Sequence, residues 1–268
     1  MRVMLTRRDF LTTLATATSA FALSACGGGS GGSSAPTTDA PAAGSGDGAD
    51  AKGDGVMSYA DYVAAAVDEH VTIECFVQAT QSWWEGKISI YAADADGGYF
   101  IYNATCTEED AAKLTPGQKI KVEGYKAEWS GEVEVAEGAT IEFEDGSTYI
   151  ASATDVTDLL GTESLIDYQN QLVSFTGMTI EASVGDGGSD VAFLYNYDGS
   201  GSEGDDLYFN ASTAGQTYTF TVESYLCDAS SDVYKAVQGL TIGEVVDLEG
   251  FLYWYEGANP HITKVVKA

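Results

Sequence analysis

Two stretches of the sequence align without gaps: LTPGQKIKVEGY at residues 114–125 and LTIGEVVDLEGF at residues 240–251. Each opens on Leu-Thr-x-Gly, continues with alternating apolar residues and ends on Glu-Gly-aromatic, and the alignment extends to Gly131 and Gly257. The copies lie 126 positions apart, which is too long for the repeating unit of a solenoid. The repeat therefore predicts two related domains in series.

Each copy is expected to consist mostly of strands around one short helix. In the first copy, apolar residues alternate with polar ones over 71–77, the period of a half-buried strand. Thr107 and the acidic residues after it predict a capped helix that runs to Leu114. The other strands expected in the first copy are 87–92, 99–102, 119–126 and 133–143. Those expected in the second are 172–182, 191–197, 207–210, 245–253 and 261–266, with an additional strand at 218–226 and a helix at 232–240.

Three strands, a helix and two further strands is the order of the OB-fold, a five-stranded Greek-key barrel. Both copies resemble OB-fold domains, and the chain as a whole resembles the tandem OB-fold lipoproteins of gut bacteria. Gly177 fits the glycine that OB first strands often carry at their bend, whereas Cys75 takes that place in the first copy. The resemblance implies an all-β fold with short helices: two tandem OB-fold-like barrels, at residues 57–146 and 147–268. A pair of β-sandwiches is the alternative.

The N-terminal segment has the pattern of a signal peptide. Arg7 and Arg8 precede a weakly apolar run that ends at the small residues before Cys26. The run is too short to span a bilayer, which takes about 20 residues. The arginine pair resembles the twin-arginine export signal, although Thr12 stands where that family usually has lysine.

The residues around Cys26 predict a lipid anchor. Leu-Ser-Ala-Cys at 23–26 resembles the bacterial lipobox, which implies that Cys26 is acylated after cleavage. Residues 27–56 are built mainly from Gly, Ser, Ala, Thr, Pro and Asp, a composition typical of a disordered linker. We therefore expect residues 1–26 to be a lipoprotein signal peptide, and the protein to be anchored in the cell membrane, facing the extracellular or cell-wall side.

The charge of the chain predicts that nucleic acid is not a partner. The sequence has 41 acidic and 12 basic residues, a net charge of −29. Removal of residues 1–26 takes away three arginines and one aspartate and leaves about −31. Such a field repels a phosphate backbone, whereas nucleic-acid binders show basic patches. The expected partners are the membrane, through Cys26, and a glycan or protein ligand; solvation outside the cell is the simplest reason for so much acid.

Catalytic and cofactor motifs are missing from the sequence. His70 and His261 lie in different copies, and the sequence contains no Gly-x-Ser-x-Gly, HExxH, P-loop or Rossmann pattern. Since catalysis needs a tuned base or nucleophile with partners, we expect no enzyme and no cofactor. An accessory domain of an extracellular hydrolase system is the alternative.

Three cysteines follow Cys26: Cys75, Cys106 and Cys227. An odd number leaves at least one unpaired or bonded to a partner, and Cys75 with Cys106 is the only pair within one expected domain. Connectivity cannot be deduced from sequence, so this pair is left open, and the spacing does not form a zinc site.

Two acidic turns are calcium candidates. Asp94 and Asp96 begin like an EF-hand loop, but Tyr99 and the following strand replace its later ligands. The second candidate is the loop at 198–206. In both, Asp and Gly are typical of a plain turn, which we favour over a metal site.

Exposed aromatic residues at loops give the candidate ligand platform. Trp83 and Trp84 follow the first strand, Trp129 lies in the turn before the last strand, and Tyr253-Trp254-Tyr255 occupy the corresponding turn of the second copy. In OB-folds the loops between strands 1 and 2 and between strands 4 and 5 bind oligonucleotides and oligosaccharides. The rings could also plug the barrels or pack between the domains, which we favour because large apolar residues are usually at least partly buried.

These observations predict a non-catalytic binding or interaction module, tethered at the cell surface and acting through two OB-fold domains. A carbohydrate-binding or accessory domain and a structural envelope protein are the alternatives.

Overall fold

The computed structural model describes residues 52–267, so Arg7, Arg8, Cys26 and most of the expected linker lie outside the described residues. In the part of the chain that is described, no helix has both the length and the apolar character needed to cross a bilayer.

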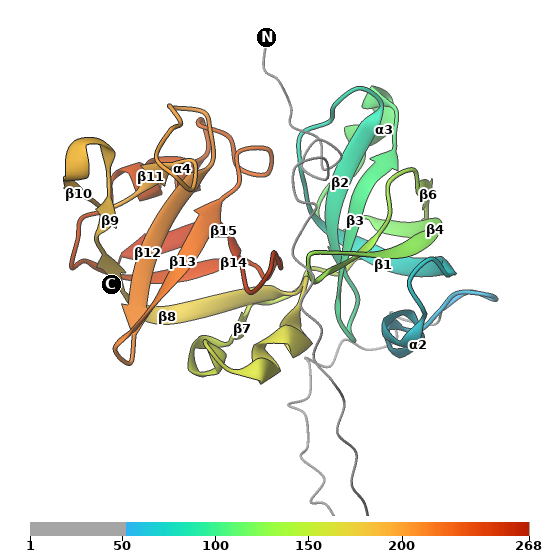
Figure 1. Ribbon diagram of the computed structural model, residues 1–268. Coiled ribbons are helices and arrows are strands. Elements are labelled where there is room, and N and C mark those ends of the chain that lie inside the picture. Colours follow the sequence, from blue (N-terminus) through green and yellow to red (C-terminus); the bar gives the residue numbers. More distant parts are fainter. Residues whose placement is uncertain (1–51, 268) are drawn as a thin grey trace, which may run out of the picture. The chain divides into compact units, whose positions relative to one another are not determined.

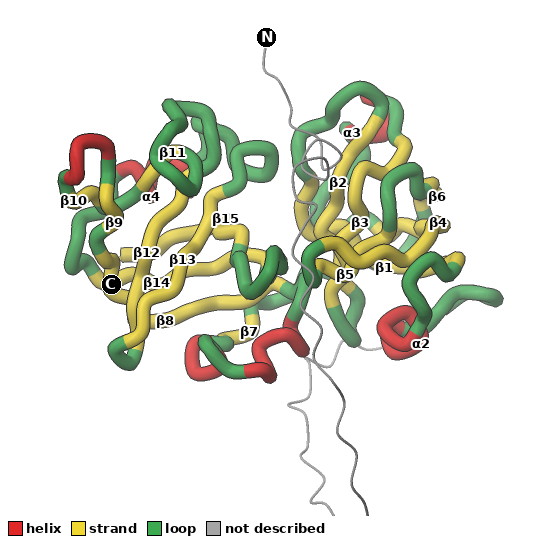
Figure 2. Tube along the Cα trace, viewed as in Figure 1, coloured by secondary structure: helices red, strands yellow, loops and turns green. Residues whose placement is uncertain are grey.

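The first barrel is a closed sheet with the strand order β1-β2-β3-β5-β4, in which β1 also pairs with β4 and β6 lies beside β4. All its pairings are antiparallel except that of β3 with β5. Figures 1 and 2 show these strands curling into one barrel. Its elements are α2 (Tyr59–Ala64), β1 (His70–Thr80), β2 (Lys87–Ala93), β3 (Gly98–Thr105), α3 (Glu108–Ala111), β4 (Lys119–Trp129), β5 (Glu132–Val135) and β6 (Thr140–Phe143).

The second barrel repeats this topology with β8-β12-β13-β15-β14, closed by pairing of β8 with both β12 and β14. Its third and fifth strands, β13 and β15, are parallel, as β3 and β5 are in the first barrel. The barrel elements are β8 (Leu172–Glu181), β12 (Leu207–Thr213), β13 (Gln216–Val222), α4 (Asp232–Gln238), β14 (Val245–Phe251) and β15 (His261–Lys267). Shorter pieces are β7 (Thr154–Asp155), β9 (Ser183–Val184), β10 (Asp190–Val191), β11 (Leu194–Tyr195) and 3-10 helices at Thr157–Leu159, Glu163–Tyr168 and Asp186–Gly188.

This topology confirms the expected fold, two tandem OB-fold-like barrels with few short helices. Strand order 1-2-3-5-4 with closure between strands 1 and 4 is the OB-fold. A β-sandwich consists of two separate sheets. Here β1 and β4, the two ends of the five-strand order, pair with each other and close a single sheet, which excludes that alternative.

The strand assignment of the second copy was wrong in one respect. The expected strand at 191–197 forms only the two-residue strands β10 and β11, within a long excursion between β8 and β12. Its apolar residues Ala192, Phe193 and Tyr195 instead pack against the barrel core from this excursion. The second and third barrel strands are β12 and β13, so the copy has no additional strand in its barrel.

Glycines in the repeated motif explain why the motif recurs. Gly117 and Gly243, which end Leu-Thr-x-Gly, have φ angles of +89° and +85°, a region that favours glycine. Gly250, in Glu-Gly-aromatic, lies so close to the neighbouring strand that a Cβ would collide with the His261 carbonyl. The equivalent Gly124 is crowded by Val135. The motif therefore specifies a turn and a close approach between the last two strands of each barrel.

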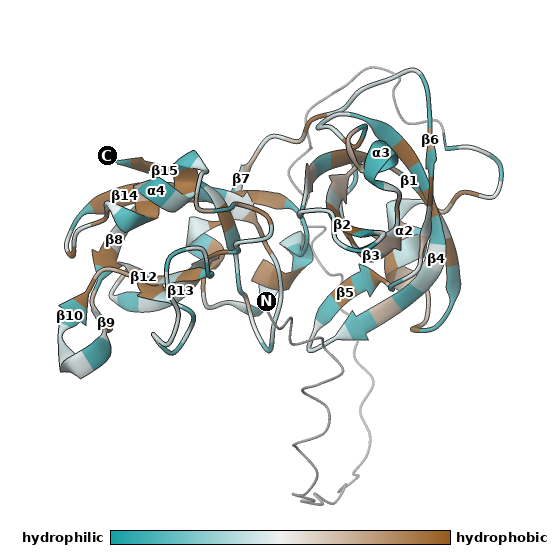
Figure 3. Ribbon diagram, turned by 90° about the horizontal axis from the view of Figure 1, so that it is seen from above, coloured by the Kyte–Doolittle hydropathy of each residue, from teal (hydrophilic) through white to brown (hydrophobic). Residues whose placement is uncertain are grey.

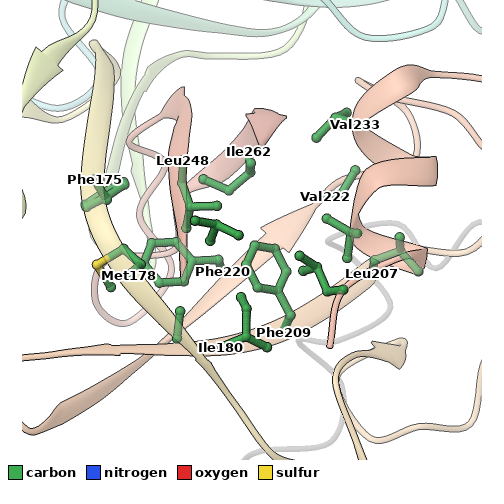
Figure 4. Packing of buried hydrophobic residues seen from close by; sticks show 14 of the residues in the cluster. Phe175, Met178, Ile180, Leu207, Phe209, Phe220, Val222, Val233, Leu248 and Ile262 are labelled. Carbon is green, nitrogen blue, oxygen red and sulfur yellow. The ribbon is translucent and has the colours of Figure 1, made fainter. Parts of the chain in front are cut away.

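Each barrel encloses its own hydrophobic core. In the second, the rings of Phe175 and Phe209 both pack on Phe220, with centroid distances of 5.1 and 5.7 Å. Figure 4 shows these rings among labelled aliphatic side chains such as Met178 and Leu248. Apolar and hydrophilic segments alternate along the strands in Figure 3, as expected when one side of each strand faces a core.

Candidate ligand-binding face

The outward side of the second and third strands, which is the usual ligand face of an OB-fold, differs between the two barrels. In β2 and β3, Ile90 and Ile101 point into the core, so Tyr91 and Phe100 point outward. In β12 and β13 the outward positions carry small polar residues and Tyr208, because Leu207, Phe209 and Phe220 point into the core. We name these outward surfaces the first-barrel face and the open face.

The first-barrel face is buried against the second barrel. Tyr91 stacks on Phe251 with a centroid distance of 4.4 Å and an angle of 8°, and Phe100 meets the edge of Tyr253 at 5.4 Å. These four residues form a separate hydrophobic cluster, and each is at most 7% exposed. Both barrels belong to one compact unit of the chain. The surface that could hold a ligand in the first barrel is therefore occupied by the second barrel.

A buried histidine completes this junction. The hydroxyl of Tyr91 and Nδ1 of His261 are 3.0 Å apart, and the His261 ring stacks on Tyr253 at 4.5 Å. Complete burial lowers the pKa of His261 to about 3, because the charged imidazolium would lose its hydration. His261 is therefore neutral at physiological pH.

Side-chain amides from the segment between the barrels form hydrogen bonds to the first barrel at this junction. The Gln169 amide donates to the Gly131 carbonyl at 2.8 Å, and the Asn170 amide donates to the Val133 carbonyl at 2.8 Å. The backbone N–H of Trp254 donates to the buried carboxylate of Glu132 at 2.8 Å. These bonds satisfy polar groups at a buried contact, where an unpaired group would be costly.

The open face is polar. Tyr208, Asn210 and Ser212 of β12 lie opposite Thr221, Thr219 and Thr217 of β13, and this pairing sets two rows of side chains. Asn210 accepts from the Thr219 hydroxyl at 2.8 Å and donates to the Ser183 hydroxyl at 3.1 Å. β12 and β13 run side by side as the orange arrows of Figure 1. The rows offer amide and hydroxyl groups, which can donate or accept hydrogen bonds.

Aromatic rings flank these rows. Tyr208 meets Tyr197, from the excursion before β12, edge to face at 6.5 Å, and Tyr197 is 76% exposed. Tyr255, from the loop between β14 and β15, packs on Trp129 of the first barrel at 4.9 Å. The backbone bond from Glu256 N–H to the Ser130 carbonyl, 2.7 Å, fixes this contact. Tyr255, whose charge acts on Tyr208, is thus held against a residue of the first barrel.

The electrostatics around Tyr208 are acidic. Burial, followed by the charges of Asp206 and Glu223, raises the pKa of Tyr208 to about 12. Burial and the nearby Asp206 also raise the pKa of the Glu223 carboxyl to about 8, so Glu223 is largely protonated at neutral pH. Residues 172–260 contain a single basic residue, Lys235. A ligand on this face would meet rings and hydrogen-bonding groups rather than cations.

The structure separates the predicted platform residues. Trp83 and Trp84 lie on the β1–β2 loop, 36% and 51% exposed, and the Trp83 indole N–H donates to the Cys106 carbonyl at 2.9 Å. Tyr253 is 7% exposed in the junction, so it cannot present a ring to a ligand.

The rest of the set lies where the β14–β15 loop meets the first barrel. Trp129 and Tyr255 contact each other, Tyr255 acts on Tyr208, and Trp254 lies against Gly131. A role in ligand binding for the exposed Trp83, Trp84 and Tyr255, and for the partly buried Trp129 and Trp254, stays a prediction.

The calcium interpretation of Asp94 and Asp96 is not supported by their surroundings. The Asp94 carboxylate accepts the N–H groups of Asp96 and Gly97, each at 2.9 Å, and the Tyr99 hydroxyl and Lys52 amine, each at 2.7 Å. Its oxygens are thus occupied by groups of the turn, by Tyr99 and by Lys52. Over residues 52–267, no three His, Cys, Asp or Glu side chains are placed to hold a metal ion.

Within residues 52–267 no disulfide joins Cys75, Cys106 and Cys227, so the Cys75–Cys106 disulfide that was left open is not formed. Cys75 and Cys106 both belong to the first barrel core.

Tyr197 and Tyr208 were missed as site residues. The error followed from assigning residues 191–197 to the second barrel strand. Residues 207–210 were then taken for the third strand, whereas they belong to β12, the second. The alternation of Leu207, Phe209 and Ala211 with Tyr208 and Asn210 was the available signal for an outward-facing row.

No family model matches the chain, and no curated protein matches it. Several solved structures do. A murine DNA-binding protein bound to double-stranded DNA is 14% identical with a TM-score of 0.36, over 74% of this chain and 99% of that one. The Ifi202 HINa domain in complex with 20-bp double-stranded DNA is 10% identical with a TM-score of 0.37, over 76% and 99%. A replication protein A heterotrimer bound to single-stranded DNA is 7% identical with a TM-score of 0.26, over 80% and 69%.

The DNA named for these structures contradicts two predictions made from the sequence. The first prediction excluded nucleic acid as a partner and expected a glycan or protein ligand. The second described the chain as a membrane-tethered surface module, with a carbohydrate-binding or accessory domain and a structural envelope protein as alternatives. The charge argument was too broad because it considered only contacts to phosphate. OB-folds also bind single strands by stacking bases on aromatic side chains, which requires no basic residue at the ring itself. Both predictions are therefore withdrawn as statements of what the chain binds and does, whereas these structures do not test the lipid anchor at Cys26 or the location at the membrane.

Proposed function

We propose that the open face of the second barrel binds unpaired bases of nucleic acid. The observation that carries the proposal is the set of rings at Tyr197, Tyr208 and Tyr255 beside the polar rows of β12 and β13. This is the place where OB-folds bind oligonucleotides, between the loops that follow strands 1 and 4. The proposal rests on these residues and on the chemistry of stacking.

The chemistry of the face favours bases over phosphates. Every base has a π face, and its stacking on an aromatic side chain contributes about 1–3 kcal/mol. The Asn210 amide and the Thr219 hydroxyl can exchange their mutual bond for bonds to a base edge. Asp206 and the strongly negative chain repel the phosphate groups that connect the bases.

Binding should therefore depend on salt in the direction opposite to that of ordinary DNA-binding proteins. A basic protein loses affinity as salt rises, because it gains less from counterion release. In this chain, added salt screens the repulsion between Asp206, the overall charge and the phosphates. We expect the affinity for a short oligothymidylate to rise between low and high salt. An uncharged peptide nucleic acid of the same bases should bind more tightly and independently of salt.

The test is a fluorescence anisotropy titration of the full chain with both probes. Tyr208→Ala should weaken binding of the peptide nucleic acid by roughly tenfold, the loss of one stacked base. Tyr125→Ala is the matched control, because Tyr125 is an exposed tyrosine (57%) on β4 of the first barrel. A duplex should not compete, since its bases are already stacked. Absence of binding by both single-stranded probes, or equal losses in the two variants, would contradict the proposal.

For the N-terminal segment we propose, from the sequence alone, that Cys26 is acylated and holds the chain at the outer face of the cell membrane. Arg7, Arg8 and the residues 23–26 support this, independently of the ligand. Mass spectrometry of the protein from its native membrane should show a diacylglyceryl group on Cys26, and Cys26→Ala should move the protein out of the membrane fraction. An unmodified Cys26 in the processed native protein would exclude the anchor.

A further inference from the structure

A groove of about 430 Å³ lies between the β1–β2 loop and the segment that follows β13. One wall carries Ser82 and Trp83, and the other carries Tyr225 and Asp228. The Ser82 N–H donates to the Tyr225 carbonyl at 2.7 Å, and the Ser82 hydroxyl reaches the same oxygen at 3.2 Å. These bonds fix the distance between the walls.

Two aromatic rings border the groove with part of their surface exposed. Trp83 is 36% exposed, and the bond from its indole N–H to the Cys106 carbonyl fixes the orientation of the ring. Tyr225 is 37% exposed on the opposite wall. Gln81, which also lines the groove, donates from its side-chain amide to the Glu223 carboxyl at 3.1 Å. A ring held as Trp83 is can face a ligand with little loss of side-chain freedom on binding.

The charge of the groove is negative. Among the described residues that line it, Asp228 alone is charged, because burial raises the pKa of the Cys227 thiol to about 11 and keeps it neutral. Hydrogen bonds from the Ser230 hydroxyl and N–H lower the pKa of the Asp228 carboxyl, which is therefore ionised at neutral pH. The charge of Lys235, whose amine donates to the Ser230 carbonyl, contributes to this lowering. Lys113, which follows α3, is paired with Glu109 and Asp110.

We infer that this groove binds a small organic ammonium ion between Trp83 and Tyr225, with Asp228 as its counter-ion. A cation over the face of Trp or Tyr is attracted by the ring quadrupole, and quaternary ammonium groups are recognised in this way. The net charge of −29 raises the local concentration of cations around the chain. A neutral or anionic ligand would gain nothing from Asp228, so charge complementarity selects the cation.

The test is isothermal titration calorimetry of the full chain with choline and with 3,3-dimethyl-1-butanol, its uncharged isostere. We expect choline to bind and to weaken as sodium chloride is added, and the alcohol to bind about tenfold more weakly or not at all. Trp83→Ala and Asp228→Asn should each reduce choline affinity by about tenfold. Asp228→Asn keeps the size of the side chain, so a loss of binding in that variant reports charge rather than folding.

Trp84→Ala is the matched control, because Trp84 is the adjacent exposed indole and does not line the groove. Choline affinity should be unchanged in this variant. Equal affinity for choline and the alcohol, unchanged affinity in both Trp83→Ala and Asp228→Asn, or absence of choline binding at millimolar concentration would overturn the inference. None of these outcomes depends on the open face, which shares no residue with the groove.

Discussion

Replacing Phe251 by alanine should lower the free energy of unfolding by about 3–5 kcal/mol, the range for a buried phenylalanine. Phe251 is 4% exposed and stacks on Tyr91 across the junction of the barrels, so its removal leaves a cavity between two rigid walls. Urea denaturation followed by circular dichroism measures the loss. The two barrels should also unfold less cooperatively, because the junction that couples them is weakened.

The internal repeat supplies the control for this prediction. Tyr125 occupies the same position of the Glu-Gly-aromatic motif in the first barrel, but it is 57% exposed. Tyr125→Ala should change the free energy of unfolding by no more than about 0.5 kcal/mol, as expected for a surface substitution. If both variants lost the same amount, Phe251 would not be packed in a junction and the barrels would not be coupled through it.

Lowering the pH from 7 to 5 should destabilise the natural chain by about 2 kcal/mol more than a His261→Gln variant. The pKa of His261 is about 3 in the folded protein and 6.5 in a solvated chain. The unfolded state therefore binds a proton below pH 6.5 while the folded state does not. The contribution of neutral His261 to stability is fully present above pH 6.5 and is lost as the pH falls toward 3, where the difference reaches the order of 4 kcal/mol.

The comparison isolates His261 from other titrating groups. Glu223 acts in the opposite direction: its pKa of about 8 in the folded protein makes the chain less stable as the pH rises from 4.5 to 8. That contribution is common to both proteins and cancels in the difference between them. Parallel profiles for the natural chain and His261→Gln would show that His261 is not buried as a neutral imidazole.

The sequence predicted the barrels because their determinants are local. The repeated Leu-Thr-x-Gly and Glu-Gly-aromatic motifs mark a turn and a close strand crossing that only glycine allows, at Gly117 and Gly250 for example. Thr107 caps α3 through the Asp110 N–H, as its spacing predicted. These features depend on residues a few positions away in the sequence or on the neighbouring strand. They can therefore be predicted from one sequence.

The distinction between the first-barrel face and the open face depends on distant residues and could not be predicted in this way. Alternation shows that Tyr91 and Tyr208 both point outward from their barrels, but it does not show what covers them. Tyr91 is covered by Phe251, which lies 160 positions later in the chain, whereas Tyr208 is only partly covered. Net charge has a related limit as a predictor, since it sums over the whole chain and says nothing of which side chains gather at one face.

Photo-crosslinking with a short oligonucleotide that carries 5-iodouracil tests most directly whether the open face binds bases. A base that stacks on an aromatic ring places the iodinated carbon against that ring, and irradiation joins the two covalently. Peptide mapping of the crosslinked full chain should find the adduct on Tyr197, Tyr208, Tyr255 or Trp129, the rings on and beside the open face. Adducts confined to Trp83, Trp84 or Tyr125, or no adduct on any ring, would contradict base recognition at the open face.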